Sequence, residues 1–235
     1  MGRSAMENIR DLKPEEIAAL HNECVNFMLE NHPEEFDKII TTENLIAEVG
    51  WFTDYLLERL PESKYSILNV KAGLIKKLSE YGDNENDRSR YFMIVFSEED
   101  FKKELEKGNH SSQLIEDISL LHRYLLQGKE SSEMAEEQWN LILNTNYGEL
   151  DNYAVSCLDA IGKESSEIWA DFSFVSKAAG KCPPNGMTCE EWAIACDGLG
   201  GLIGLIFGGF GSVVTGTLFS YAAAHECEEC NQPNA

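Results

Sequence analysis

The stretch CDGLGGLIGLIFGGFGSVVTGTLFSYAAAHECEEC runs from Cys196 to Cys230 and decides how the chain folds. Between Gly198 and Ala224 it holds 27 residues without a formal charge. Glycine costs about 1 kcal/mol relative to alanine inside a helix, so repeated glycines in a helical segment indicate close packing against a second backbone. The glycines that we expect to form this packing surface, a glycine zipper, are Gly200, Gly204, Gly208, Gly209, Gly211 and Gly216.

The sequence GGFGS at 208–212 divides this stretch into two arms and predicts a helical hairpin. We expect the arms to span 188–207 and 212–230, the first starting at a capping box of Thr188 and Glu191. As one helix, 27 residues at about 1.5 Å each would cross a bilayer of about 30 Å, whereas each arm of a hairpin is too short. Two interpretations stay open: the hairpin is ordinary buried core, or it is a membrane-active segment stored inside the protein.

Seven cysteines are present, and most of them flank the hairpin. The candidates for disulfide bonds are Cys157, Cys182, Cys189, Cys196, Cys227 and Cys230, whereas Cys24 stands alone as a small buried side chain. A turn centred near Phe210 would place Cys196 near Cys227 and Cys189 near Cys230, leaving Cys157 to pair with Cys182. Connectivity cannot be deduced from sequence, and free thiols remain an alternative. A second alternative is a zinc site formed by His225, Cys227, Cys230 and Cys189.

Upstream of the hairpin the chain is typical of an all-α, multi-helix bundle. Apolar residues recur at helical spacing and are bounded by capping residues and glycines. The segments that we expect to be helical are 13–31, 41–61, 66–82, 97–108, 111–128, 131–144, 149–162 and 164–180. Short polar turns between such helices favour a bundle. We place a boundary between an acidic helical domain at 1–181 and a cysteine-rich hairpin domain at 182–235, because two prolines and Asn-Gly follow Lys181.

The net charge excludes some partners. The chain carries 41 acidic and 19 basic residues, a formal charge of −22, and no Lys or Arg follows Lys181. Such a surface repels phosphate backbones, so we expect no nucleic-acid partner. The N-terminal residues include no apolar segment of a signal peptide, which predicts synthesis in the cytoplasm, with export or membrane association of the C-terminal segment as a later step.

Signs of enzyme chemistry are missing from the sequence. The five histidines form no HExxH pair, and the GLGGLIG sequence at 198–204 lacks the glycine spacing and preceding strand of a dinucleotide-binding loop. His122 is expected in a satisfied core or surface position. We therefore expect a non-enzymatic protein with no cofactor and no small-molecule substrate, whose C-terminal hairpin meets a membrane or a partner helix.

The segment from Cys182 to Cys230 resembles the peptides of halocin-type bacteriocin precursors. The residues that carry the resemblance are CPPNGMTC at 182–189, GLGGLIGLIFGG at 198–209 and AAAHECEEC at 222–230. In that family an acidic N-terminal part, which can confer immunity, precedes a Cys- and Gly-rich antimicrobial peptide. The resemblance implies a precursor whose N-terminal helices shield a membrane-active hairpin. The alternative is a soluble helical interaction module in which the hairpin is buried core.

Overall fold

The computed structural model describes residues 12–33, 40–83, 89–170, 183–184 and 186–227. The regular secondary structure of these residues is helical, which confirms the all-α, multi-helix prediction. The α-helices are α2 (Pro14–Asn31), α3 (Thr42–Arg59), α4 (Lys64–Tyr81), α5 (Glu98–Glu106), α6 (Ser112–Gln127), α7 (Ser132–Asn144), α8 (Glu149–Ala170), α9 (Cys189–Gly204) and α10 (Gly209–Glu226). Short 3-10 segments are η3 (Pro61–Ser63), η4 (Phe92–Phe96), η5 (Gly128–Ser131) and η6 (Leu205–Phe207).

Polar caps fix the starts of several helices. The hydroxyl oxygens of Thr41, Ser97, Ser111 and Thr188 each accept a hydrogen bond from the backbone N–H three residues further along. Each cap satisfies one of the backbone donors that the first turn of a helix leaves without a partner. The capping box predicted at Thr188 is present, since the backbone N–H of Thr188 donates to Glu191 at 2.7 Å.

One predicted helix end is wrong. We expected a break after Gly162, but α8 continues to Ala170, and the remaining predicted segment, 171–180, lies outside the described residues. Ile161, Ser165 and Trp169 follow one another at helical spacing and are all buried. Burying this stripe outweighs the intrinsic cost of a single glycine inside a helix, about 1 kcal/mol.

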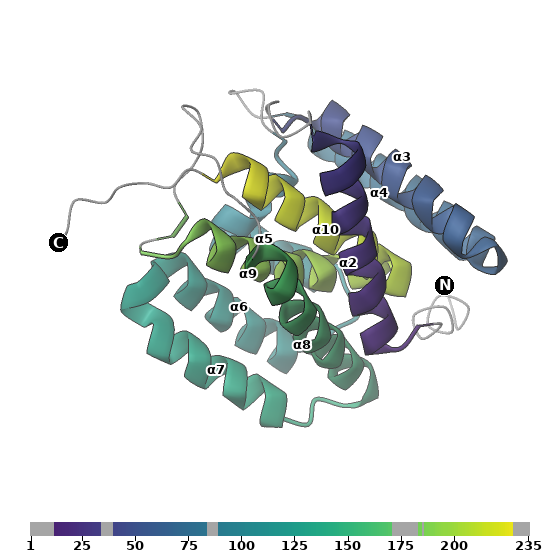
Figure 1. The fold of residues 1–235 in the computed structure, drawn as a ribbon. Helices are drawn as coiled ribbons and strands as arrows, with labels where there is room; N and C mark the ends of the chain where they lie inside the picture. Colours follow the sequence, from purple (N-terminus) through teal and green to yellow (C-terminus); the bar gives the residue numbers. More distant parts are fainter. Residues whose placement is uncertain (1–11, 34–39, 84–88, 171–182, 185, 228–235) are drawn as a thin grey trace.

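The hairpin of α9 and α10 lies in the middle of the bundle (Figure 1). Helix α10 contacts α2, α3 and α4, and α9 contacts α8 and α5. Helix α7 lies at the lower edge in Figure 1 and packs against α6. The predicted boundary at residues 181 and 182 falls in the undescribed segment 171–182, and the helices before and after it share one hydrophobic core.

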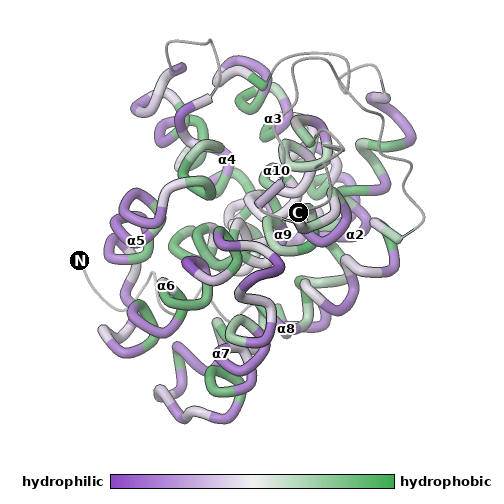
Figure 2. The backbone as a smooth tube through the Cα atoms, turned by 90° about the vertical axis from the view of Figure 1, so that its left-hand side faces the viewer, coloured by the Kyte–Doolittle hydropathy of each residue, from purple (hydrophilic) through white to green (hydrophobic). Residues whose placement is uncertain are grey.

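Burial along the hairpin is nearly continuous. In the described part of α10, every residue from Gly209 to His225 is buried. The exposed or partly exposed residues of the hairpin are Ile206 and Phe207 at the tip and Glu190, Glu191, Ile194 and Ala195 on the outer side of α9. Figure 2 shows the contrast in hydropathy: α9 and α10 carry little hydrophilic colour, whereas the surrounding helices alternate hydrophobic and hydrophilic residues. The surrounding helices are therefore amphipathic, and the buried side chains of those that contact the hairpin form one hydrophobic core with it.

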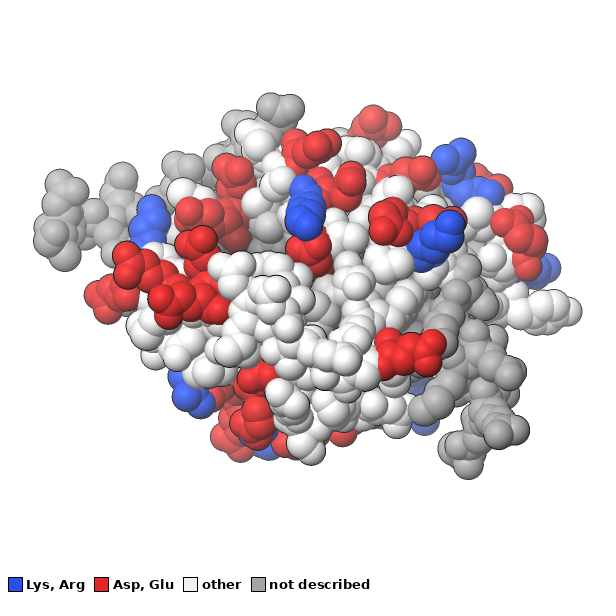
Figure 3. Space-filling model, turned by 90° about the horizontal axis from the view of Figure 1, so that it is seen from below, with Lys and Arg blue, Asp and Glu red and all other residues white. Residues whose placement is uncertain are grey.

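Acidic groups dominate the outside of the bundle. Figure 3 shows the lower face, where Asp and Glu side chains outnumber Lys and Arg and border an uncharged area. Several exposed carboxylates form ion pairs, such as Glu98 with Arg123 and Glu116 with Lys102. Exposed pairs of this kind contribute about 0–1 kcal/mol each, so the fold does not depend on them.

Glycines allow α9 and α10 to approach each other closely. A Cβ atom added to Gly204 would collide with the backbone carbonyl of Gly211, and one added to Gly211 would collide with that of Gly204. A Cβ on Gly200 would lie 2.7 Å from the carbonyl oxygen of Thr215. Since such distances are far below van der Waals contact, these three positions admit only glycine at the observed spacing.

The other three predicted packing glycines have different surroundings. Gly208 forms the turn between the arms, with φ of 89°, a conformation that favours glycine. Gly209 faces α2, where an added Cβ would lie 3.3 Å from Ile17. Gly216 lies between α2 and α9, since an added Cβ would be 3.0 Å from His21 and 3.1 Å from the carbonyl oxygen of Asp197.

Replacing Gly204 by alanine tests the close approach of α9 and α10. We expect Gly204→Ala to lower the free energy of unfolding by about 1–3 kcal/mol, because the backbones must separate to admit the methyl group. Gly50→Ala in α3 is the matched control: an added Cβ there meets nothing within 4 Å, so this variant should gain up to about 1 kcal/mol. Urea unfolding followed by circular dichroism measures both, and equal effects at the two sites would contradict the packing role.

Candidate functional site

A disulfide bond closes the open end of the hairpin. Cys189 at the start of α9 is bonded to Cys227, which directly follows α10, and their Cα atoms are 5.7 Å apart. The bond joins residues separated by 38 positions. In the chain-entropy model a loop of this size stabilises the folded state by about 4 kcal/mol. The two arms are therefore linked at both ends, by the turn at Gly208 and by the disulfide.

The predicted pairings of Cys196 with Cys227 and of Cys189 with Cys230 are wrong, because the turn lies at another residue than we predicted. We placed the centre of the hairpin near Phe210, whereas the positive φ falls at Gly208 and α10 begins at Gly209. Gly208 lies midway along the chain between Cys189 and Cys227, so this turn brings those two cysteines together. A shift of two residues in the turn changes which cysteine lies opposite Cys227.

The remaining described cysteines are free and buried: Cys24, Cys157 and Cys196. Cys157 and Cys196 were disulfide candidates, and in both cases the prediction is wrong; Cys182 and Cys230 lie outside the described residues. Burial raises the pKa of Cys157 to about 12 and also raises the pKa values of Cys24 and Cys196. Since the thiolate is the reactive form, these three thiols are chemically protected.

The alternative zinc site does not form as we described it. Two of its four ligands, Cys189 and Cys227, are bonded to each other and have no thiolate to offer. Cys230 lies outside the described residues. Across the described part of the chain, no group of three or more His, Cys, Asp or Glu side chains is placed to hold a metal ion.

A charged network inside the core attaches the hairpin to α2 and α8. The Nε2 atom of His21 in α2 lies 2.8 Å from Oδ1 of Asp197 in α9, and both side chains are fully buried. The indole Nε1–H of Trp169 in α8 donates to Oδ2 of Asp197 at 2.7 Å. Both carboxylate oxygens of the one acidic residue in the middle of α9 are thus satisfied. We refer to His21, Asn22, Asp197 and Trp169 as the His21 network.

The hydrogen bonds around His21 favour its charged form. The amide nitrogen of Asn22 donates to the carbonyl oxygen of Glu164 at 3.0 Å, which turns its Oδ1 toward Nδ1 of His21 at 3.1 Å. Both ring nitrogens therefore face oxygen acceptors, as an imidazolium requires. Burial by itself would lower the pKa of His21, but the Asp197 carboxylate opposes this effect, and the net shift is upward from 6.5. An ion pair in the core results.

The tip of the hairpin is held by α4. The ring of Phe207 lies against Gly73, where an added Cβ would be 2.7 Å from the ring. The ammonium group of Lys77, one turn along α4, lies 5.7 Å from the centre of the same ring and forms an ion pair with buried Glu104 of α5. Burial lowers the pKa of Lys77, and Glu104 opposes that shift. The tip therefore contacts α4 through an aromatic ring and a cation.

The sequence analysis did not identify the His21 network. One signal for it was present, because Asp197 is the one formal charge in the sequence between Trp192 and Ala224. A carboxylate in such an apolar segment needs a cationic partner when the segment is buried. The partner itself, His21, is 176 positions away along the chain, and no local pattern connects the two. His122, in contrast, lies in the core, where its Nε2 donates to the carbonyl oxygen of Val95 at 2.9 Å; its buried Nδ1 has no hydrogen-bond partner among the described residues, so the residue is only half satisfied.

The hairpin helices are short and only moderately apolar. Among the residues described by the structure, no helix combines the length and hydropathy needed to cross a membrane. The glycines and hydroxyl groups of α10 reduce its hydropathy, as the sequence indicated.

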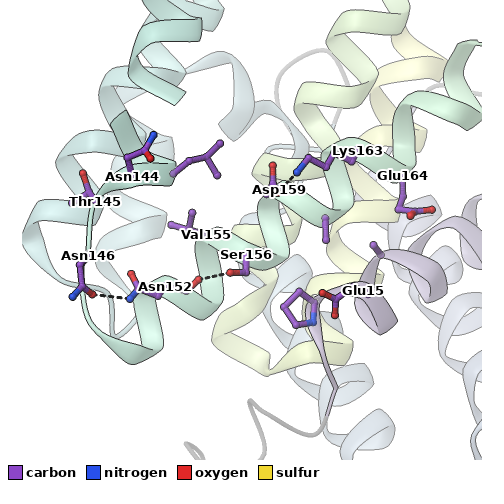
Figure 4. A pocket seen from close by; sticks show the side chains of 14 residues that line it. Glu15, Asn144, Thr145, Asn146, Asn152, Val155, Ser156, Asp159, Lys163 and Glu164 are labelled. Atoms are coloured by element: carbon purple, nitrogen blue, oxygen red, sulfur yellow. Dashed lines mark hydrogen bonds and ion pairs between the residues drawn. The ribbon is translucent and has the colours of Figure 1, made fainter. Parts of the chain in front are cut away.

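A polar pocket lies on the outer side of α8. It has a volume of 550 Å³ and is bordered by the start of α2, the loop that follows α7, and the exposed face of α8 (Figure 4). Its polar groups contact one another: the amide nitrogen of Asn152 donates to Asn146, the hydroxyl of Ser156 to the carbonyl oxygen of Asn152, and Lys163 to Asp159. The lining groups are thus used in holding the loop and the helix together.

Counting thiols tests the Cys189–Cys227 bond. In a variant in which serine replaces Cys182 and Cys230, five cysteines remain, and two of them form this bond. We therefore expect three reactive thiols in denaturant before reduction and five after it. Cys189→Ser with Cys227→Ser should in addition lower the free energy of unfolding by about 4 kcal/mol. Five thiols before reduction would show that the bond is not formed.

The raised pKa of His21 makes stability depend on pH. A histidine whose pKa is higher in the folded state stabilises the protein fully below about pH 6.5, and this contribution is lost as the pH rises through the folded value. We expect the free energy of unfolding to fall as the pH rises above about 6.5 in the natural protein, and to fall less in Asp197→Asn, which removes the charge that raises the pKa of His21.

Measurements above pH 6.5 distinguish the contribution of His21 to stability from that of His122. Burial lowers the pKa of His122, so that group changes stability with the opposite sign and only below its ordinary value of 6.5. Urea unfolding at several pH values measures the slope for each variant. Equal slopes for the natural protein and Asp197→Asn would contradict the ion pair.

Comparisons with known proteins identify no homologue. No protein-family model, curated protein or solved structure matches the chain. The resemblance to halocin-type precursors therefore rests on the pattern of glycines and cysteines at 182–230 and stays a prediction.

Proposed function

We propose that this protein is a water-soluble carrier of a membrane-active helical hairpin, similar in organisation to a bacteriocin precursor. Helices α2 to α8 are the shield, and α9 with α10 is the cargo. The observation that supports the proposal best is the burial of an uncharged 27-residue stretch, Gly198–Ala224, at the centre of amphipathic helices. Such an arrangement keeps an apolar hairpin in solution until the shield opens.

The charge of the shield requires release before membrane contact. With a net charge of −22, the folded protein is repelled by anionic lipid surfaces. The hairpin itself carries its formal charges near its open end, apart from Asp197, which the His21 network neutralises in the folded state. Once separated from the shield, the tip at Leu205–Phe210 would present four large apolar side chains and no formal charge.

The length of the arms limits how deeply the hairpin can enter a lipid bilayer. Helices α9 and α10 have 16 and 18 residues, which correspond to about 24 Å and about 27 Å, less than a hydrocarbon core of about 30 Å. The Cys189–Cys227 bond keeps the arms together at the charged end. We therefore propose insertion tip first, as a wedge in one leaflet, with the disulfide end remaining in water.

A second candidate function is a soluble interaction module whose hairpin is permanent core. The close fit between hairpin and shield favours it. A Cβ added to Gly201 would lie 2.7 Å from Ile161 of α8, and one added to Gly73 of α4 would meet Phe207 at 2.7 Å. Such complementarity is expected of a core that stays closed.

Opening the shield without changing the hairpin distinguishes the two candidates. His21→Ala removes the partner of Asp197 from α2 and should destabilise the protein by about 3–5 kcal/mol, because it leaves a buried carboxylate without its counter-charge. If the hairpin is cargo, this variant should release dye from phosphatidylcholine vesicles faster than the natural protein does. Fluorescence dequenching of an entrapped dye measures the rate.

Ile142→Ala is the matched control for that experiment. Ile142 is fully buried in α7, which packs against α6, and its truncation costs about 2–5 kcal/mol without touching the His21 network. Selective leakage with His21→Ala supports the carrier. No leakage from either variant favours the interaction module. Equal leakage from both would assign the effect to general unfolding and overturn the proposal that the His21 network keeps the hairpin in the shield.

A further inference from the structure

An apolar groove of 610 Å³ lies between the α6–α7 pair and the α8–α9 pair. It is distinct from the hairpin interior, although the outer side of α9 forms one of its walls. Its apolar lining is Leu121, Leu125, Ala135, Trp139, Leu158, Gly162, Met187, Ile194, Ala195, Gly198 and Leu199. Among these residues Leu121, Leu158 and Leu199 are buried, and Trp139 is partly exposed. A continuous apolar surface of this kind on an acidic protein indicates a binding site.

The α8 wall of the groove has room for an occupant. Gly162 lies in the middle of this wall, and a Cβ atom added there would meet nothing within 4 Å. Its neighbours Leu158 and Ser166 lie one turn away on either side and line the same groove. The open space at Gly162 is therefore not required by packing within the bundle, in contrast to Gly204 at the contact of α9 with α10.

The charge around the groove selects a cationic occupant. Its charged lining residues are Glu136, Asp159, Lys163 and Glu191. Lys163 is the one cation among them, and its ammonium group lies 2.6 Å from the carboxylate of Asp159. The rim thus has a net negative charge on a protein of charge −22. Fatty acids, anionic lipids and nucleotides would be repelled, whereas lysines and arginines would be attracted.

The shape of the groove fits a helix. Along α8 it extends from Leu158 to Ser166, and along α9 from Glu191 to Leu199, which is about two helical turns or 12 Å on each wall. Apolar anchors at positions i, i+3 or i+4 and i+7 of an amphipathic helix span this length. The acidic side chains at the edge would then meet basic residues beside the anchors.

We propose that this groove binds a cationic amphipathic helix of a partner protein, with its leucine or phenylalanine side chains over Gly162 and its lysines or arginines at Glu136 and Glu191. This binding site does not depend on release of the hairpin. It operates in the closed bundle, because all four of its walls belong to the folded shield and the outer face of α9.

The proposal is tested with the full chain and a fluorescent peptide of about four helical turns, built from leucine on one face and lysine on the other. Fluorescence anisotropy measures its affinity. Gly162→Leu fills the groove without changing any charge and should weaken binding by roughly tenfold or more. Gly162→Ala, which adds one methyl group, should have a much smaller effect. Thermal unfolding of both variants verifies that the bundle remains folded.

Charge variants distinguish binding in the groove from non-specific attraction of a cationic peptide to an acidic surface. Glu136→Gln at the rim should weaken binding several-fold. Glu43→Gln, at an exposed position of α3, removes the same charge elsewhere and should change the affinity little. A peptide with glutamates in place of lysines should not bind. Equal affinity of Gly162→Leu and the natural protein would overturn the proposal, and so would displacement of the peptide by a long-chain fatty acid, which would identify a lipid site instead.

Discussion

The buried ion pair of His21 and Asp197 is the interaction on which the arrangement of the hairpin depends. A carboxylate alone in this core would cost several kcal/mol, and the cost is offset by an imidazolium from α2 and an indole donor from α8. Three helices must therefore take up one relative position for the charge to be satisfied. Apolar packing alone would tolerate small shifts of α9 against its neighbours, whereas two directional bonds to one carboxylate do not. The single charge in an apolar hairpin sets its register in the bundle.

Two kinds of glycine explain how the hairpin fits. Gly204 and Gly211 are used where backbones meet, and Gly208 where the chain reverses with a positive φ. Gly162 belongs to neither kind, since its missing side chain leaves open space at the surface groove. The hairpin interior and the groove are thus different sites. One is filled by the protein itself, and the other is a surface groove with acidic residues at its rim.

Local patterns predicted the helices well, because caps such as Thr41 and Ser111 and the apolar stripes act within a few residues. They also predicted a hairpin. The disulfide was missed because its pairing depends on the residue at the centre of the turn, and GGFGS offers several glycines for that position. The extension of α8 through Gly162 and the His21–Asp197 pair both depend on contacts between distant segments. The sequence marks Asp197 as an isolated charge in an apolar stretch, but no local pattern identifies His21 as its partner.

The position of His21 in the chain has a consequence for folding during synthesis. The first described helix holds the counter-charge for a residue 176 positions later, and the helices that pack against the hairpin all precede it in the chain. At about 5–20 residues per second, α2 leaves the ribosome many seconds before Asp197 exists. Until then the amphipathic helices have no common core to cover. We therefore expect the nascent chain to stay open, and to close in one late cooperative step when α9 and α10 emerge.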